Sequence, residues 1–180
     1  MRLFLTGSPG IGKTTVIRSI LKSLQGLKCA GFYTEEKREQ GQRTGFKIRT
    51  LDGREGTLAS AGHRKGPKVG RYTVHLEEFE GLVIGRIDPE TTPADLYVID
   101  EIGKMELFSE RFRNKLTDLL SQPSNVLATI AKKGSSFLDE IKRRDDVELI
   151  EVTKQNRDRL PDGIAERILV AIKAGLGEET

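Results

Sequence analysis

The stretch "GSPGIGKTT" (residues 7–15) decides the fold. It has the spacing G-x-x-x-x-G-K-[ST] of a phosphate-binding loop, with Gly7, Gly12, Lys13 and Thr14 at the fixed positions. Glycine lets the main chain approach an anion closely, so that successive N–H groups form a concave nest. The sequence therefore predicts a site that holds phosphate groups, with Lys13 supplying a full positive charge and the Thr14 hydroxyl available to Mg²⁺.

The residues on either side have the pattern that such a loop requires. A short apolar run at residues 2–5 predicts a buried strand before the loop. Residues 13–24 predict a helix, because the spacing places Val16, Ile20, Leu21 and Leu24 on one face. The helix adds its positive N-terminal end to the same anion site. The first unit is thus strand, glycine loop and helix.

The rest of the chain continues this alternation of strands and helices. We expect an α/β fold with a mainly parallel sheet flanked by helices on both faces, in a single domain spanning residues 1–180. Further strands are predicted at 28–34, 95–101, 125–131 and 146–153, and helices at about 108–120, 135–144 and 162–174.

One region departs from the alternation and predicts a small antiparallel β insertion around residues 43–76. Asp52-Gly53 is a turn signal between two runs with strand character, which indicates a hairpin, and residues 70–76 add a third strand. The preceding segment, residues 35–43, is strongly polar and is predicted to be a mobile loop.

A second motif, "LYVIDEIGKMEL" (residues 96–107), supplies the acids that a phosphate loop needs. Asp100 follows four apolar residues at the end of a predicted strand, where a carboxylate that binds magnesium belongs. Glu101 comes next and can reach a water aligned on the γ-phosphate, orient it and accept its proton. We predict catalytic roles for Glu101, Lys13 and Lys104, the last as an internal substitute for an arginine finger. A solvated side chain is the alternative for Lys104.

Composition limits the partners and the compartment. Thirty Lys and Arg residues nearly balance 27 Asp and Glu, which leaves a net charge of +3 and makes nucleic acid an unlikely partner. No apolar run is long enough to cross a membrane, and one cysteine permits no internal disulfide. We expect a cytoplasmic monomer. His63 and His75 lack neighbours typical of a metal site.

At this point the chain resembles a known family, the small phosphate-loop nucleoside-triphosphatases of thermophiles, whose animal members are called cancer-related nucleoside-triphosphatase. Six segments carry the likeness in order along nearly the whole chain: "FLTGSPGIGKTT" (4–15), "GFYTEE" (31–36), "GF" (45–46), "VGRYTVHL" (69–76), "DEIGKMELFS" (100–109) and "VTKQNRDRLP" (152–161). The pairing of "GFYTEE" with "DEIGKMELFS" is more particular than the phosphate loop alone.

The resemblance implies a RecA-like phosphate-loop fold and Mg²⁺-dependent hydrolysis of nucleoside triphosphates with broad base tolerance. Thr14 and Asp100 would be the metal ligands. Asn156 and Arg157 match a family motif without an assigned role; they border the base, or Asn156 caps the last helix. The implied nucleotide-binding residues are Gly7, Ser8, Pro9, Gly10, Ile11, Gly12, Lys13, Thr14 and Thr15 in the loop, and Asp100, Glu101, Ile102, Gly103 and Lys104 in the second motif.

Two other functions use the same residues. A nucleotide or small-molecule kinase would replace the attacking water by a substrate hydroxyl, but no clear arginine-rich lid stands out to exclude water, although Arg54, Arg64 and Arg71 lie near the predicted hairpin. A nucleotide-gated switch or RNA-binding module is disfavoured by the small net charge.

Overall fold

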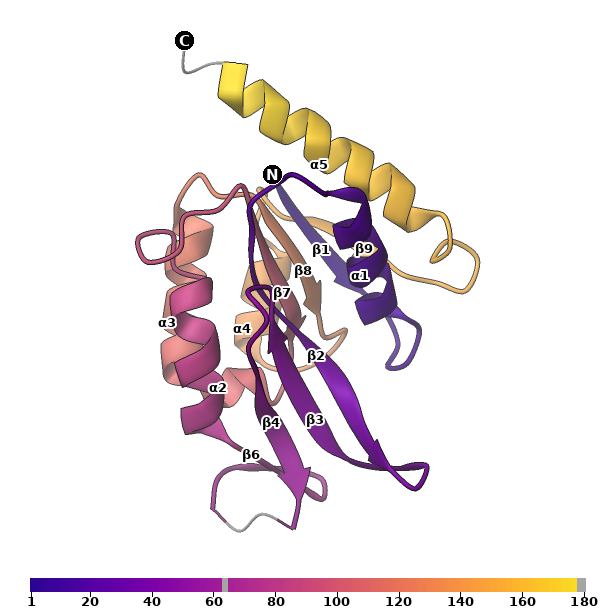
Figure 1. Ribbon diagram of the computed structural model, residues 1–180, viewed down its shortest axis with the longest axis vertical. Helices are drawn as coiled ribbons and strands as arrows, with labels where there is room; N and C mark the ends of the chain where they lie inside the picture. The colour runs from indigo at the N-terminus through magenta and orange to yellow at the C-terminus, as the bar shows by residue number, and fades with distance from the viewer. Residues whose placement is uncertain (63–64, 178–180) are drawn as a thin grey trace.

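The protein is built on one twisted sheet. The structure, a computed structural model, describes residues 1–62 and 65–177, and within them nine strands form a sheet of order β5-β6-β4-β3-β2-β7-β8-β1-β9. The strands from β2 to β9 in this order pair in parallel, and the strands from β5 to β2 pair antiparallel. The two halves meet at β2, and Figure 1 shows the antiparallel strands extending away from the helices α1 and α5.

The parallel half carries the strand–loop–helix unit predicted from the first residues. It consists of β2 (Cys29–Glu39), β7 (Leu96–Ile102), β8 (Val126–Ile130), β1 (Arg2–Thr6) and β9 (Glu148–Glu151). Since all five run in one direction, their carboxyl ends meet at the same edge of the sheet, which is where ligands bind in open α/β sheets.

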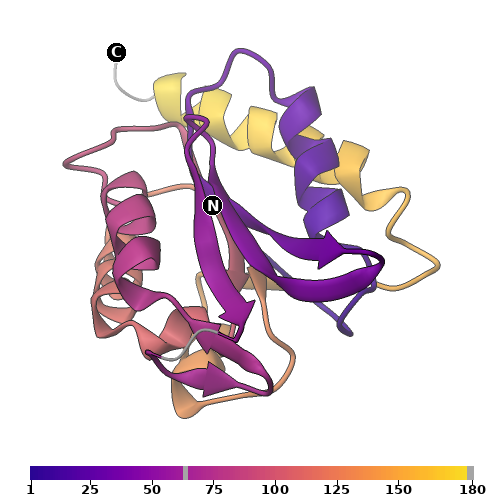
Figure 2. The ribbon, with the colours of Figure 1, turned by 60° about the horizontal axis from the view of Figure 1, so that its bottom comes forward.

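Helices cover both faces of the sheet, as the alternating pattern predicted (Figures 1 and 2). Helices α1 (Lys13–Ser23) and α5 (Leu160–Gly177) pack together on one face. Helices α2 (Leu76–Val83), α3 (Glu110–Ser121) and α4 (Ser136–Lys142) cover the other. The apolar residues of the strands alternate between these two layers.

The alternation is clear in β1, where neighbouring side chains enter different cores. Leu3 and Leu5 pack with the apolar face of α1, whereas Phe4 points to the opposite layer. In that second layer Phe32 of β2 meets Phe79 of α2 edge-on, at 5.8 Å between ring centroids, and Phe112 of α3 at 6.1 Å. Aromatic pairs of this geometry add to the energy of area burial.

The predicted antiparallel insertion is confirmed. It consists of β3 (Gln42–Thr50), β4 (Glu55–Ala61), β5 (Lys68–Val69) and β6 (Tyr72–Val74). The turn between β3 and β4 contains Asp52-Gly53, as the sequence indicated, and Gly53 adopts a positive φ of 89°.

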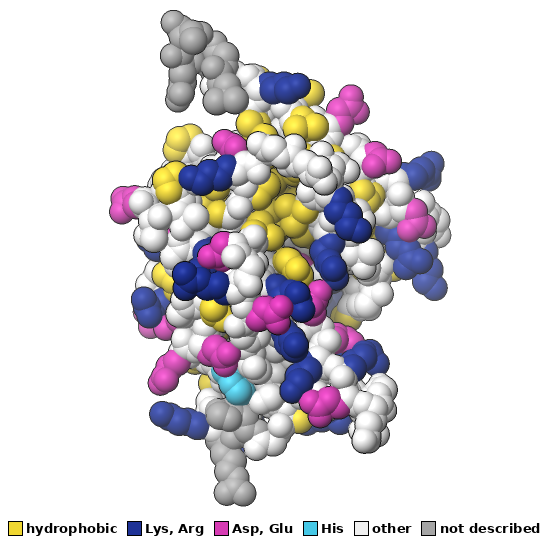
Figure 3. All heavy atoms as spheres, in the orientation of Figure 1, with side chains coloured by type: hydrophobic (Ala, Val, Ile, Leu, Met, Phe, Trp, Pro, Cys, Tyr) yellow, Lys and Arg dark blue, Asp and Glu magenta, His cyan; other side chains and the backbone are white. Residues whose placement is uncertain are grey.

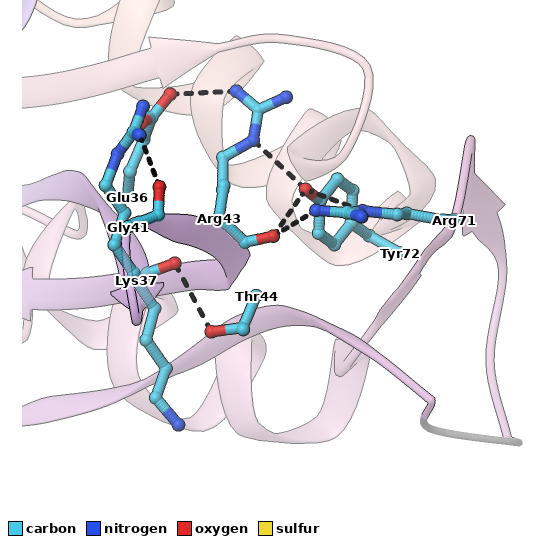
Figure 4. Close-up of polar contacts among 8 residues, drawn as sticks. Glu36, Lys37, Gly41, Arg43, Thr44, Arg71 and Tyr72 are labelled. Atoms are coloured by element: carbon cyan, nitrogen blue, oxygen red, sulfur yellow. Dashed lines mark hydrogen bonds and ion pairs between the residues drawn. The ribbon is translucent and has the colours of Figure 1, made fainter.

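The prediction of a mobile loop at residues 35–43 is wrong. Strand β2 continues to Glu39, and β3 begins at Gln42, so these residues form the tip of a hairpin. Gln40 and Gly41 both have positive φ values, of 50° and 79°, which suit a two-residue hairpin turn. The polar character that suggested a loop belongs to ion pairs: Glu36 accepts hydrogen bonds from Arg38 and from Arg43, the second of which is drawn in Figure 4.

Other predictions have mixed outcomes. The short helix α2 was not predicted from the sequence, and a 3₁₀ turn, η1 (Ile84–Arg86), follows it. The predictions for His63 and Arg64 fall on residues outside those the structure describes. Basic and acidic side chains are interspersed over the face seen in Figure 3, in agreement with the balanced charge. In the described part of the chain no helix is long and apolar enough to span a membrane.

Candidate functional site

The loop between β1 and α1 lies at the carboxyl edge of the sheet, and its glycines are required by its backbone. Gly7, Gly10 and Gly12 have φ values of 149°, 75° and 109°. A Cβ on Gly7 would lie 2.8 Å from the carbonyl oxygen of Val152, so a larger residue cannot occupy this position without a shift of the backbone. The sequence therefore folds residues 7–12 into a tight loop directly before the helix.

Helix α1 begins with its N–H groups open. Gly12 is the N-cap residue, and no side chain of the described residues caps this end. Uncapped N–H groups and the helix dipole together favour an anion at this place. The binding of phosphate at this open helix end stays a prediction from the glycine spacing.

Lys13 lies inside the site, with only 8% of its surface exposed. Its Nζ donates a hydrogen bond to the carbonyl oxygen of Gly7 at 3.3 Å and lies 3.8 Å from Oε2 of Glu101. The ammonium group thus sits between the start of the loop and the end of β7. Because neither contact is short, a phosphate oxygen can compete for the same charge.

Asp100 is buried at the base of the loop. Its Oδ1 accepts a hydrogen bond from the Thr129 hydroxyl, on the neighbouring strand β8. Burial raises the pKa of Asp100 to about 6, and the nearby charge of Glu101 acts in the same direction, while hydrogen bonds from Thr129 and Thr14 lower it. Because burial disfavours the ionised carboxylate, a nearby cation is needed to stabilise that form.

The residues present fit a magnesium ion. The Oδ2 atom of Asp100 is buried without a hydrogen-bond partner in the described structure, and Thr14 bonds the same carboxyl group. The structure places no three His, Cys, Asp or Glu side chains together as a metal cluster among residues 1–62 and 65–177. Mg²⁺ does not need one, since it commonly takes one or two protein oxygens and completes its shell with waters and substrate phosphates.

Glu101 follows Asp100 at an irregular point of β7. The register between β7 and β8 shifts between Ile99 and Ile102, and the Asp100–Glu101 peptide is cis. The Glu101 side chain is about one-third exposed and lines a cavity of about 1200 Å³ together with the loop and Lys13. Of the two adjacent acids Asp100 and Glu101, only Glu101 lines the cavity, which Glu35 and Glu36 of the hairpin also line, whereas Asp100 is fully buried.

The second motif contains an acid that the sequence reasoning missed. Glu106, in the 3₁₀ turn η2 (Glu106–Phe108), is 4% exposed and lies against Gly103 on the side where Glu101 also approaches. Burial, together with the nearby charges of Glu101 and Asp100, raises its pKa to about 8. The only available signal was a glutamate inside an apolar run, which does not by itself indicate burial.

Other predicted residues of this motif lie away from the cavity surface. Ile102 is in the hydrophobic core and Lys104 is exposed. The cations that do line the cavity, among the described residues, are Lys13, Arg18, Arg38, Arg43, Lys132 and Lys133. The role of Lys104 remains a prediction, and the hairpin and the segment after β8 supply charge that the sequence did not suggest.

The hairpin of β2 and β3 forms the outer wall of the cavity. Arg43 pairs with Glu36 at 2.8 Å, and its Nε donates to the Tyr72 hydroxyl at 3.1 Å (Figure 4). The Arg43 guanidinium also lies 5.2 Å from the centre of the Phe46 ring. These contacts hold a positively charged side chain in place on β3.

Asn156 and Arg157 lie in the turn before α5. The Asn156 Oδ1 accepts from the Thr153 N–H at 2.8 Å, and the Asn156 N–H donates to the Thr153 hydroxyl at 3.3 Å. This reciprocal pair resembles a capping box, but it closes the turn that precedes α5 and not the first turn of the helix. Arg157 reaches the phosphate loop, where its Nη1 donates to the carbonyl oxygen of Ile11 at 3.3 Å.

Comparison with known proteins gives a consistent result. The model of a family described as NTPase matches residues 2–165. The chain is 41% identical over 179 residues to the nucleoside-triphosphatase THEP1 of Thermotoga sp. (strain RQ2), with 99% of each chain covered. It is 44% identical over 177 residues to the human cancer-related nucleoside-triphosphatase, covering 89% of this chain and 93% of that one.

A solved structure supports the same relationship. The crystal structure of THEP1 from the hyperthermophile Aquifex aeolicus superposes with a TM-score of 0.83 at 37% sequence identity, covering 91% of this chain and 96% of that chain. The similarity therefore extends to the sheet, the loop at its carboxyl edge and the helices around it.

Proposed function

The chain belongs to the NTPase family, and from that premise we propose that it hydrolyses nucleoside triphosphates to nucleoside diphosphate and phosphate with magnesium bound. It is a nucleoside-triphosphatase; the metal, the attacking water and the tolerance of different bases are the parts we propose. The contact between Lys13 and Glu101 carries the proposal, because it joins the phosphate loop to an acid that faces the cavity.

The residues of the loop bind and orient the triphosphate. N–H groups of the loop and of the start of α1 donate to phosphate oxygens, and Lys13 turns from Gly7 and Glu101 to the β- and γ-phosphates. Thr14 and Asp100 would hold Mg²⁺, which when bound would neutralise negative charge on the phosphates. Burial raises the pKa of Asp100, and an adjacent cation would lower it again. The ionised carboxylate would therefore be favoured when the metal is bound.

Glu101 acts on the water. Its carboxylate accepts a hydrogen bond from a water placed beyond the γ-phosphate and takes the proton as the oxygen bonds to phosphorus. The bond from phosphorus to the bridging oxygen breaks, and that oxygen leaves on the nucleoside diphosphate. Lys13 and the cations of the cavity, Arg43 and Lys133 among them, favour the charge that accumulates on the transferred group.

The phosphate loop contacts only phosphates, so it does not distinguish bases. We propose that the enzyme acts on ATP, GTP, CTP and UTP alike, and that it works in the cytoplasm as a monomeric single domain whose partner is the nucleotide. The kinase alternative is not favoured, since the relatives that match nearly the whole chain are named as triphosphatases.

Phosphate release tests the proposal directly. We expect wild type to release phosphate from all four triphosphates with Mg²⁺ and none with a chelator in its place, and we expect the Lys13→Ala variant to release none. Formation of diphosphate that requires an added acceptor, with no phosphate released, would contradict hydrolysis. Equal rates with the chelator would contradict the role of the metal.

A further inference from the structure

A second cavity, of about 410 Å³, lies between α1 and the turn before α5. Gly12 and Thr15 line both this cavity and the larger one that contains Glu101, so the two adjoin at the N-terminus of α1. Val16 and Ser19 of the helix, and Arg157, Asp158 and Pro161 across from it, complete the walls of the smaller cavity. Its volume is within the range of small-molecule sites, which span roughly 300–1,000 Å³.

The positions of the two cavities fix a direction for a bound nucleotide. The γ-phosphate must face Glu101, which lines the larger cavity. The α-phosphate and the nucleoside then extend the other way, past Gly12 and Thr15 and toward the side of α1 that carries Ser19. The smaller cavity is the space that this direction reaches.

Arg157 is held over the end of the phosphate loop. Its Nη1 donates to the Ile11 carbonyl oxygen at 3.3 Å, and a Cβ built on Gly12 would lie only 3.9 Å from its Cδ. Its Nε lies 3.6 Å from a carboxylate oxygen of Asp158. The side chain is 43% exposed, so a face of the guanidinium group is accessible from the cavity.

The turn that carries Arg157 is itself fixed. The reciprocal hydrogen bonds of Thr153 and Asn156 close it, and Asn156 Nδ2 donates to the Glu151 carbonyl oxygen at 2.8 Å. The Arg157 N–H donates to the Thr153 carbonyl oxygen at 3.0 Å. Asn156 is therefore a positioning residue, because it orients the backbone from which Arg157 extends.

We propose that the smaller cavity is the nucleobase subsite and that the Arg157 guanidinium group stacks on the base. This inference rests on the proposed function. A planar guanidinium stacks on the face of any aromatic ring without reading its edge. The hydroxyls of Thr15 and Ser19 in the walls both donate and accept, so they impose no single base pattern. The Asp158 carboxylate in the same walls only accepts, but it lies 3.6 Å from Arg157 Nε, which offers it a donor within the protein. Broad base tolerance follows from these wall residues.

Binding measurements with and without a base test the proposal. We would titrate wild type, Arg157→Ala, Arg157→Lys and Arg159→Ala with non-hydrolysable analogues of ATP and GTP and with inorganic triphosphate, following heat. Arg159 is the matched control: it is exposed in the same turn, bonds the Gln155 carbonyl oxygen and is not among the described residues that line the cavity.

The expected result separates the base from the phosphates. Arg157→Ala should raise the Kd of both analogues about tenfold, a typical effect of one lost stacking contact, and leave the Kd of inorganic triphosphate unchanged. Unchanged triphosphate binding also shows that the variant is folded. Arg157→Lys should behave like Arg157→Ala, since an ammonium group has no plane, and Arg159→Ala should behave like wild type.

Three outcomes would overturn the inference: no change in analogue binding, an equal loss for inorganic triphosphate, or full recovery with lysine. The failure of the proposed function looks different. In that case wild type would bind neither analogue nor triphosphate, or would bind them without any release of phosphate from the natural triphosphates.

Discussion

Lys13 Nζ lies 3.8 Å from Glu101 Oε2, although the two residues come from the first helix and the third parallel strand of the chain. The contact spans the mouth of the phosphate loop. In the proposed mechanism the lysine turns to the phosphates when nucleotide binds, and the Glu101 carboxylate, which lines the cavity, is freed to act on water. Under that proposal one ion pair would couple substrate binding to release of the base.

Replacing Glu101 by glutamine should separate binding from hydrolysis. The amide cannot accept a proton from water, so we expect turnover to fall by at least about 10²-fold, the contribution typical of a general base. Nucleotide affinity should be kept or improved, because Lys13 loses a competing partner. Phosphate release and a titration with a non-hydrolysable analogue check the two parts.

A matched control is Glu140→Gln on α4, an exposed acid that lies outside the cavity lining formed by the described residues. It should turn over substrate like wild type. Undiminished turnover in Glu101→Gln would show that another group takes the proton.

Glu106 should make stability depend on pH in a particular direction. Its folded-state pKa, raised to about 8 from the ordinary 4.5, means that the folded protein holds a proton that the unfolded chain releases. The resulting stabilisation is complete below about pH 4.5 and is lost as pH rises through about 8.

The variant Glu106→Gln keeps a neutral side chain at every pH. Its free energy of unfolding should therefore rise relative to wild type as pH increases, by on the order of 4 kcal/mol between about pH 5 and pH 9. Urea denaturation at several pH values measures this difference. A constant difference across the range would mean that Glu106 does not carry the extra proton.

The sequence predicted the parts of the site that depend on local patterns. Gly7 to Gly12 form a loop between a strand and a helix because the glycine spacing and the apolar residues agree, and Asp100 directly follows the apolar run of β7. Each of these features is determined by residues within about one element of one another.

Features that depend on distant residues were not predictable in this way. Charged residues 35–39 belong to a strand because Glu36 finds Arg43 across the hairpin, and a strand of this kind has no apolar alternation to detect. Glu106 is 4% exposed in the folded protein, and Arg157 reaches Ile11 across 146 positions of sequence. Tertiary packing decides all three.

Gly7 should tolerate no side chain. With φ at 149° and Val152 O only 2.8 Å from a new Cβ, Gly7→Ala must move the backbone of the loop, at a cost of about 1–3 kcal/mol. We expect lower stability and weaker triphosphate binding, measured by urea denaturation and calorimetry. Gly10→Ala is the comparison, because its φ of 75° is strained but no atom lies within 4 Å, so the cost should be only about 1 kcal/mol.

The hairpin tip offers a test of the strand found in place of the expected loop. Gln40 adopts a φ of 50°, which a residue with a Cβ tolerates poorly, whereas Gln42 begins β3 with ordinary extended geometry. Gln40→Gly should therefore stabilise the protein by a few tenths to about 1 kcal/mol, because glycine adopts positive φ without steric cost. Gln42→Gly should destabilise it by about 0.5–1 kcal/mol, since glycine loses more entropy in a strand. Chemical denaturation of both variants measures the change in the free energy of unfolding. A mobile loop would give small and nearly equal changes at the two positions. An ordered hairpin should give changes of opposite sign.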